Sequence, residues 1–224
     1  MKQTNKVLEI CVDSLESAIA AEQGGADRIE LCSALVDGGI TPSAGLLTMV
    51  RKKLSIGVFV MIRPRGGDFL YSEPEFEQMK EDIRSVRQLG ADGVVFGILN
   101  KMGRVDIKRT RRLVEFAAPL PVTFHRAFDM TPDLIEALDA VVKTGASRIL
   151  TSGGAPNVTA GMRTLAKLVQ AAKERITIIP GGGVKTENIA HLAEKTKAHE
   201  YHASARSSYP SPMLFQKRKV VLSD

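Results

Sequence analysis

Two short phrases of the sequence each place a carboxylate and a thiol two residues apart. Glu9 precedes Cys11 in LEICV, and Glu30 precedes Cys32 in IELCS. Side chains two apart on a strand point to the same face, so each phrase would present both groups on one side. If the strands are neighbours, the two sets lie about 4.8 Å apart. Two soft thiols favour Cu(I) over hard cations, whereas the alternative interpretation is that both cysteines are small buried hydrophobes.

Cationic and titratable groups follow other apolar runs of the sequence. Arg63 begins the glycine-rich stretch RPRGGD, and His125 begins HRAFD, which ends at Asp129. Two buried carboxylates need a cationic partner, which Arg63, His125 or Arg126 would supply. Because imidazole titrates near neutral pH, His125 is the best candidate for a general acid or base.

Glycine-rich phrases near the end of the sequence indicate an anion site. Gly181, Gly182 and Gly183 follow one apolar run, and the stretch from Ser204 to Ser208, which includes Arg206, follows the next. Backbone N–H groups of such loops frequently bind phosphate in α/β barrels. The structural alternative is a tight turn that needs glycine.

A repeated phrase supplies the elements that would position these groups. GGADRIEL from Gly24, LGADGVVF from Leu89, TGASRILT from Thr144 and a degraded TKAHEYHA from Thr196 each join a helical stretch to a short apolar run. Glycine ends a helix readily because it enters the left-handed region without a Cβ penalty. The runs have the length and composition of strands. Eight strands are predicted near residues 7–11, 28–32, 58–62, 93–96, 122–125, 148–151, 176–179 and 201–203.

The alternation of these strands with helices predicts the fold. It implies a parallel sheet with right-handed crossovers, and eight units in 224 residues predict closure into a (β/α)8 TIM barrel. The alternative, an open doubly wound sheet, lacks a Gly-x-Gly-x-x-Gly phrase after the first strand. In a barrel, functional groups gather at the carboxyl ends of the strands, where the phrases above lie. We therefore expect a barrel over residues 1–208 and a basic tail over 209–224.

The sequence after the eighth predicted strand does not fit the repeat. It contains Pro210 and Pro212 and has little helical periodicity, so the eighth helix is expected to be missing or displaced. The outer apolar faces of the last and first strands would then be uncovered, which is costly at roughly 25 cal/mol per Å². A neighbouring subunit or the folded-back tail is expected to cover this seam.

Composition narrows the cellular setting and the partners. The chain is 44% hydrophobic and 25% charged, with no apolar run near the roughly 20 residues of a membrane span and no leader-like segment. We expect a cytoplasmic protein with reduced cysteines and no membrane partner. The net charge of +6 indicates affinity for anions. Nucleic acid is not the expected partner, because base-stacking aromatics are not interleaved with the basic clusters at 101–112 and 217–219.

The longer motifs resemble the CutC copper homeostasis family. They span Leu8 to Ser208 and comprise EICVDSLESA, GGADRIELCS, VFVMIRPRGGDFLYS, LGADGVVFG, LPVTFHRAFDM, RILTSGG, PGGGV and HASARSS. The resemblance implies a cytoplasmic (β/α)8 barrel, a homo-oligomer (dimer or tetramer), a part in copper tolerance, and Cu(I) bound by Cys11 and Cys32. It further implies that one barrel mouth is lined by Glu9, Glu30, Arg63, His125 and Asp129. Similar family members continue into a final helix that this sequence lacks.

Two functions stay open on the sequence alone, as does the question of whether the protein is an enzyme. The first is a copper-handling protein in which Cys11 and Cys32 hold Cu(I). The second is an enzyme acting on a small phosphorylated or carboxylated metabolite. In that case His125 is the acid or base, Glu9 or Glu30 a partner base, and Arg63 an anion clamp, with Gly181 to Gly183, Ser204 and Arg206 holding the anion. The resemblance favours copper, whereas the many arranged charges favour the enzyme.

Overall fold

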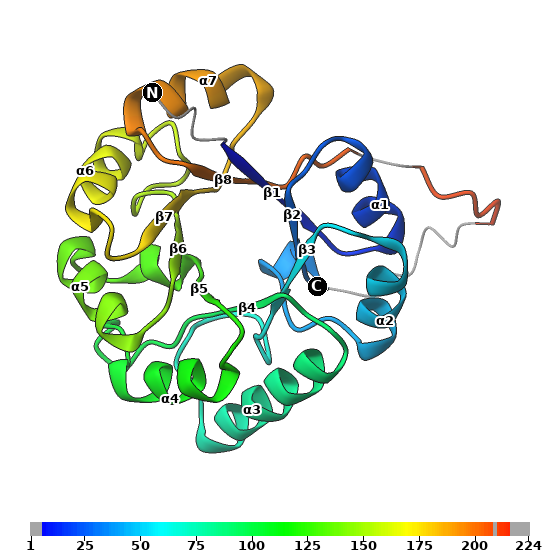
Figure 1. Cartoon of the computed structure of the whole chain (residues 1–224), viewed down its shortest axis with the longest axis horizontal. Helices are drawn as coiled ribbons and strands as arrows, with labels where there is room; N and C mark the ends of the chain where they lie inside the picture. The colour runs from blue at the N-terminus through cyan, green and yellow to red at the C-terminus, as the bar shows by residue number, and fades with distance from the viewer. Residues whose placement is uncertain (1–5, 208–209, 216–224) are drawn as a thin grey trace.

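Eight parallel strands form a barrel, as the repeat predicts (Figure 1). The computed structural model describes residues 6–207 and 210–215. The strands are β1 (Val7–Val12), β2 (Arg28–Leu31), β3 (Gly57–Met61), β4 (Gly93–Phe96), β5 (Val122–Phe124), β6 (Arg148–Thr151), β7 (Thr177–Pro180) and β8 (Glu200–Ala203). Their order is β7-β6-β5-β4-β3-β2-β1-β8, and a parallel bridge between Gly181 and His202 joins the two ends. Residues far apart in sequence therefore meet at the β8–β1 junction.

Helices surround the strands in Figure 1. Within the described residues there are seven α-helices and two short 3-10 helices, Leu35–Asp37 and Arg126–Met130. The α-helices are α1 (Leu15–Gln23), α2 (Ala44–Lys53), α3 (Glu73–Gln88), α4 (Ile107–Ala117), α5 (Leu134–Thr144), α6 (Met162–Ala172) and α7 (Thr186–Thr196). None of these is long and apolar enough to cross a membrane.

Side-chain caps mark the starts of helices. Ser72 and Glu75 form a capping box at the start of α3. Ser14, and not the adjacent Asp13, is the cap of α1 and accepts a hydrogen bond from the Ser17 amide. Adjacent Asp and Ser are both good caps, so sequence alone does not separate them.

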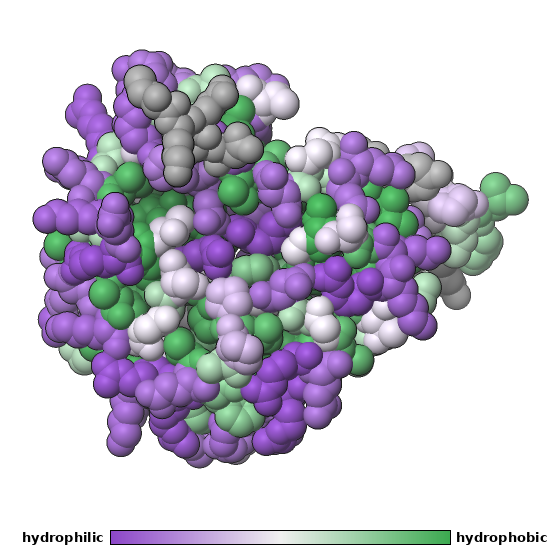
Figure 2. All heavy atoms as spheres, in the orientation of Figure 1, coloured by the Kyte–Doolittle hydropathy of each residue, from purple (hydrophilic) through white to green (hydrophobic). Residues whose placement is uncertain are grey.

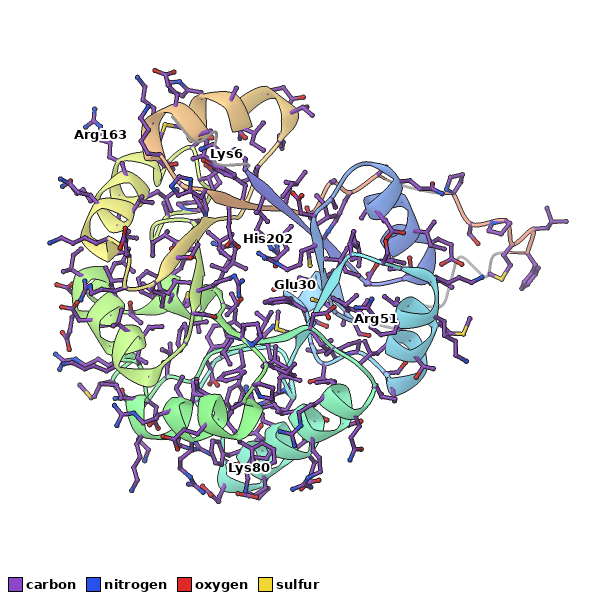
Figure 3. All side chains as sticks on the ribbon, viewed as in Figure 1. Lys6, Glu30, Arg51, Lys80, Arg163 and His202 are labelled. Atoms are coloured by element: carbon purple, nitrogen blue, oxygen red, sulfur yellow. The ribbon has the colours of Figure 1, made fainter. Side chains whose placement is uncertain are left out.

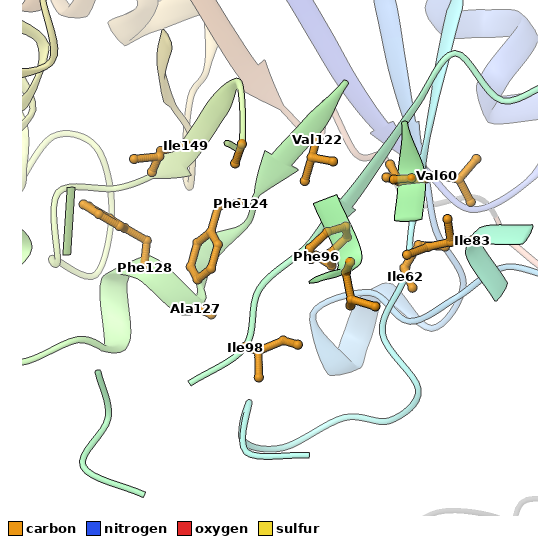
Figure 4. Close-up of a cluster of buried hydrophobic side chains, with 14 of the residues drawn as sticks. Val60, Ile62, Ile83, Phe96, Ile98, Val122, Phe124, Ala127, Phe128 and Ile149 are labelled. Carbon is orange, nitrogen blue, oxygen red and sulfur yellow. The ribbon is translucent and has the colours of Figure 1, made fainter. Parts of the chain in front are cut away.

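The main core lies between the strands and the helices. Figure 4 shows part of it, where side chains of β3, β4, β5 and β6 pack with Ile83 of α3 and Phe128. A second, smaller cluster fills the barrel interior with Cys11, Cys32, Phe59, Met61 and Val95. The two cysteines are therefore inside the barrel, on the face that the two-residue spacing predicts.

The eighth helix is absent from the described residues, as expected. Residues 210–215 instead extend away from the barrel past α1 and α2 (Figure 1). Their side chains Met213, Leu214 and Phe215 are exposed and form a hydrophobic tip in Figure 2. The basic residues at 217–219 lie outside the described residues, so the predicted basic tail is described only in part.

A groove follows the outer face of β1, where the missing helix was expected. It has a volume of about 590 Å³ and is lined by Leu8 and Ile10 of β1, Ala20 and Ala21 of α1, and residues 204–207. Leu8 and Ile10 are only partly buried. The prediction of an uncovered face therefore holds for the first strand among the described residues, but it is wrong for the last strand, where Tyr201 and Ala203 are buried in a core cluster.

Candidate metal centre and cavity

Glu9 is the centre of a buried ion-pair network inside the barrel. It lies opposite Arg28 of β2 and His202 of β8 in the strand registers. Its carboxylate accepts hydrogen bonds from Arg28 Nε at 2.5 Å and His202 Nδ1 at 2.7 Å. Arg28 also pairs with Glu200 at 2.6 Å. The opposite charges of three strands thus lie in contact with one another.

The thiols lie one layer further along the strands. Cys11 is opposite Glu30 in the β1–β2 register, and Cys32 follows β2 directly. The two Sγ atoms are 3.7 Å apart, and Cys32 Sγ is 3.6 Å from Glu30 Oε2. His202 Nε2 lies 3.9 Å from the same carboxylate oxygen. Figure 3 shows His202 and Glu30 near each other in the centre of the barrel.

This arrangement separates the proton affinities of the groups. Burial raises the pKa of Glu9, but the hydrogen bond and charge of His202, with Arg28, lower it to about 2. Burial opposes charge on His202 as well, yet Glu30, Cys11 and Glu9 together raise the pKa of His202 well above its usual value. The charged imidazolium form of His202 is therefore favoured next to the thiols.

The two thiols differ in proton affinity. A hydrogen bond from Cys32, helped by His202 against the effect of burial, lowers the pKa of Cys11 well below its ordinary value. The same hydrogen bond, burial and the Glu30 charge raise the pKa of Cys32. Burial, with the negative charge of Cys11 next in size, raises the pKa of Glu30. These shifts make Cys11 the more readily ionised of the two thiols.

Two sets of residues present potential metal ligands within 4.8 Å of one another: Cys11 with Glu30 and Cys32, and Glu9 with Glu30 and His202. In the second set Glu9 is already bound by Arg28 and His202. In the first set the thiols bind only each other and Glu30 among the described residues. Sulfur ligands suit Cu(I), so the first set fits that ion.

Above these groups lies a cavity of about 420 Å³ at the carboxyl ends of the strands. Most of the predicted site residues meet there: Cys11, Glu30, Arg63, His125, Asp129, Gly182, Gly183, Ser204 and Arg206. Glu9 and Cys32 do not line it, and both are wholly buried. The sequence prediction of one common mouth is therefore close to the arrangement found.

Gly181 and Asp129 make contacts that hold the backbone in place. Gly181 pairs with His202, and a Cβ on it would lie 2.4 Å from Leu150 Cδ1. Asp129 accepts hydrogen bonds from Thr151 Oγ1 and from the amides of Ser152 and Gly154. Gly181 thus allows close packing, and the Asp129 carboxylate fixes the loop after β6.

His125 differs from its expected chemistry. It is 4% exposed, and burial, followed by the charge of Arg63, lowers its pKa to about 3. Its Nδ1 accepts a hydrogen bond from the Ala127 amide at 3.2 Å. The imidazole is therefore neutral near pH 7 with its hydrogen on Nε2, which suits a hydrogen-bond donor better than a general base.

Sequence reasoning left Arg28 and Glu200 out of the site. The signal was present, because Arg28 precedes Glu30 by two residues on a predicted strand, and Glu200 precedes His202 by two residues, directly before the strand predicted near 201–203. Applying the same-face rule to every strand would have placed them inside the barrel. Phe69, which lies against Arg63 and His125, carries no such signal because it belongs to a loop.

The sequence was compared with protein families and with known proteins. The model of the CutC family matches residues 6–207. A human protein named copper homeostasis protein cutC homolog is 50% identical over 96% of this chain and 79% of its own length. A CutC family protein of Chromobacterium violaceum is 49% identical over 95% of this chain and 86% of its own.

The fold was also compared with solved structures, and a CutC protein is among those that superpose on this chain. The copper homeostasis protein CutC of Streptococcus agalactiae superposes with a TM-score of 0.85 and 34% identity, over 89% of this chain and 98% of that one. An aldolase with a TM-score of 0.70 and 15% identity shares the fold alone. The family match and these relatives together show that this chain belongs to the CutC family.

Proposed function

We propose that the protein binds Cu(I) through Cys11 and Cys32 and takes part in copper homeostasis. The observation that carries the proposal is the 3.7 Å separation of the two Sγ atoms inside the barrel, where Cys11 also lines the cavity. Relatives named as copper homeostasis proteins support the cellular role. Two thiol ligands match the preference of Cu(I) for soft donors.

The surrounding charges prepare the thiols for a cation. Thiolate is the metal-binding form, and the lowered pKa of Cys11 favours that form. Cys32 carries a proton that binding would release, so apparent affinity should increase with pH. Glu30 and His202 lie within reach to orient or neutralise the loaded site.

The setting and assembly of the protein form part of the same proposal. We infer a cytoplasmic homo-oligomer, dimer or tetramer, in which a second copy covers the β1 groove. The partly exposed Leu8 and Ile10 support this, as do the exposed Met213, Leu214 and Phe215. Sedimentation of the whole chain tests it: an oligomer is expected, and a stable monomer would contradict it.

A second candidate function is an enzyme that acts on a small phosphorylated or carboxylated metabolite. The observation that favours it is the cationic lining of the cavity by Arg63, Arg126 and Arg206. Gly182, Gly183 and Ser204 lie beside these arginines as candidates to hold the anion. Glu30, which lines the same cavity, is the candidate base. A pKa of about 3 makes His125 too weak a base for this role.

Competition with a colorimetric Cu(I) chelator tests the copper proposal. Cys11→Ser and Cys32→Ser should each weaken Cu(I) binding, and the double variant should abolish competition. Met102→Leu is the matched control, because this sulfur-containing side chain is 77% exposed and far from the barrel interior. Unchanged competition by the double variant would refute the proposal. For the enzyme, a metabolite screen in which Glu30→Gln loses turnover would support the second function.

A further inference from the structure

Arg63 is a buried cation without a carboxylate partner among the described residues. It is 4% exposed, and its Nη atoms donate to backbone carbonyls of Asp37, Gly39 and Gly67 at 2.7 to 2.9 Å. Its Nε has no hydrogen-bond partner in the described part of the chain, and the neighbouring Tyr71 hydroxyl is likewise unpartnered there. Arg28, which is buried to a similar degree, has two carboxylates. Burying a charge without a counter-ion is costly, so Arg63 needs an anion.

His125 presents a second unused donor on the same side of the cavity. Because Nδ1 accepts from Ala127, the hydrogen lies on Nε2, and that atom is buried without a partner among the described residues. Buried donors in folded proteins are satisfied almost without exception, so each orphan needs an explanation. A ligand that accepts hydrogen bonds would explain both.

Phe69 connects the two donors. Its ring centroid is 5.0 Å from Arg63 Cζ and 4.9 Å from the centroid of the His125 ring. All three residues line the 420 Å³ cavity. The cation and the neutral donor therefore both lie against the same aromatic ring in the lining of the cavity.

The remaining lining indicates the class of anion. Apolar side chains of Leu35, Met61, Met130 and Leu150 face the same cavity. Inorganic phosphate gains nothing from such a surface, whereas a short hydrocarbon body does. Two N–H donors also match the two oxygens of a carboxylate better than the three of a phosphate group.

We propose that this part of the cavity binds a small organic carboxylate, whose oxygens accept hydrogen bonds from Arg63 Nε and His125 Nε2 while its apolar body lies against Phe69 and Met61. The site is distinct from the two thiols and does not depend on copper. It lies in the same cavity, so a bound carboxylate would stand above the Cys11 and Glu30 side chains.

Calorimetric titration of the metal-free chain with butyrate tests the proposal. Butyrate should bind more tightly than acetate because of its longer apolar body. Neutral butyramide and inorganic phosphate should bind at least about tenfold more weakly than butyrate, since a charge-assisted hydrogen bond is involved. Phosphate binding tighter than butyrate, or butyramide binding equal to butyrate, would overturn the proposal.

Variants assign the binding to the two donors. His125→Phe keeps a ring against Phe69 but removes the donor, and should weaken butyrate binding about tenfold. Arg63→Gln should weaken it further, and circular dichroism checks that its backbone contacts are not essential for folding. Arg104→Gln, whose side chain is 60% exposed, is the matched control and should bind butyrate normally. Wild-type affinity in folded His125→Phe would contradict the assignment.

The two proposals are separable in the same experiment. The Cys11→Ser, Cys32→Ser double variant should lose Cu(I) and keep butyrate binding, because neither thiol contacts Arg63 or His125 among the described residues. Loss of butyrate binding in this folded variant would show that the carboxylate site is not independent and would overturn the proposal.

Discussion

The carboxylate of Glu9 and the imidazole of His202 meet at 2.7 Å, across 193 residues of sequence. This hydrogen bond joins β1 to β8, next to the junction that a single bridge between Gly181 and His202 closes. The ion-pair network around Glu9 and the closure of the barrel therefore share His202. A substitution in the Glu9, Arg28 and His202 network should therefore change the stability of the fold as well as the environment of the thiols.

Glu9→Gln should destabilise the fold by about 3 kcal/mol, because it leaves Arg28 and His202 with a buried, uncompensated charge. Urea unfolding followed by circular dichroism measures the change. Glu77→Gln is the control, since that carboxylate is 49% exposed and pairs only with Lys80 in the described structure. The control should change stability by less than about 1 kcal/mol. Equal effects of the two variants would contradict the role of the network.

The stability of the protein should depend on pH through His125. Its pKa is about 3 in the folded chain and near 6.5 when unfolded, so the unfolded state binds more protons between these values. Stability from this group is present above pH 6.5 and is lost as pH falls towards 3. Between pH 7 and 5 the loss is about 2 kcal/mol, at up to 1.4 kcal/mol per unit.

His125→Phe isolates this contribution. The variant lacks the titrating group, so its free energy of unfolding should fall about 2 kcal/mol less than that of the wild type between pH 7 and 5. Other titrating groups are common to both proteins and cancel in the comparison. Parallel pH profiles would mean that His125 is not buried as a neutral imidazole.

The sequence was sufficient for predicting the fold and for placing the two pairs of carboxylate and thiol. Glycine-terminated helices and short apolar runs placed the eight strands to within a residue or two, because both signals are local. The two-residue spacing likewise placed Glu9 and Cys11, and Glu30 and Cys32, inside the barrel. Local patterns and strand geometry were enough for these statements.

The rest depended on residues that only the closed barrel brings together. His125 was expected to titrate near neutrality, but burial beside Arg63 makes it a neutral donor. The partners of Glu9 come from β2 and β8, and nothing near residue 9 in the sequence indicates them. Proton affinities and ion pairs of this kind follow from tertiary packing, which a local pattern does not contain.

Gly93 shows how tightly the barrel interior is packed. A Cβ on Gly93 would lie 2.5 to 2.7 Å from ring atoms of Phe59, which packs with the cysteines. Gly93→Ala should therefore destabilise the fold by about 1–3 kcal/mol. Gly45→Ala in α2 places its Cβ no closer than 3.9 Å to a neighbouring side chain and should stabilise by up to about 1 kcal/mol. Thermal unfolding compares the two, and a Gly93→Ala variant as stable as the wild type would show that the Phe59 ring moves freely.

The claim that Cys11 and Cys32 hold Cu(I) together is tested most directly by copper K-edge X-ray absorption on the loaded protein. The account predicts two sulfur neighbours in the wild type, and loss of one in each single cysteine-to-serine variant. A copper shell made only of nitrogen and oxygen, or a wild-type spectrum retained by the double variant, would contradict it.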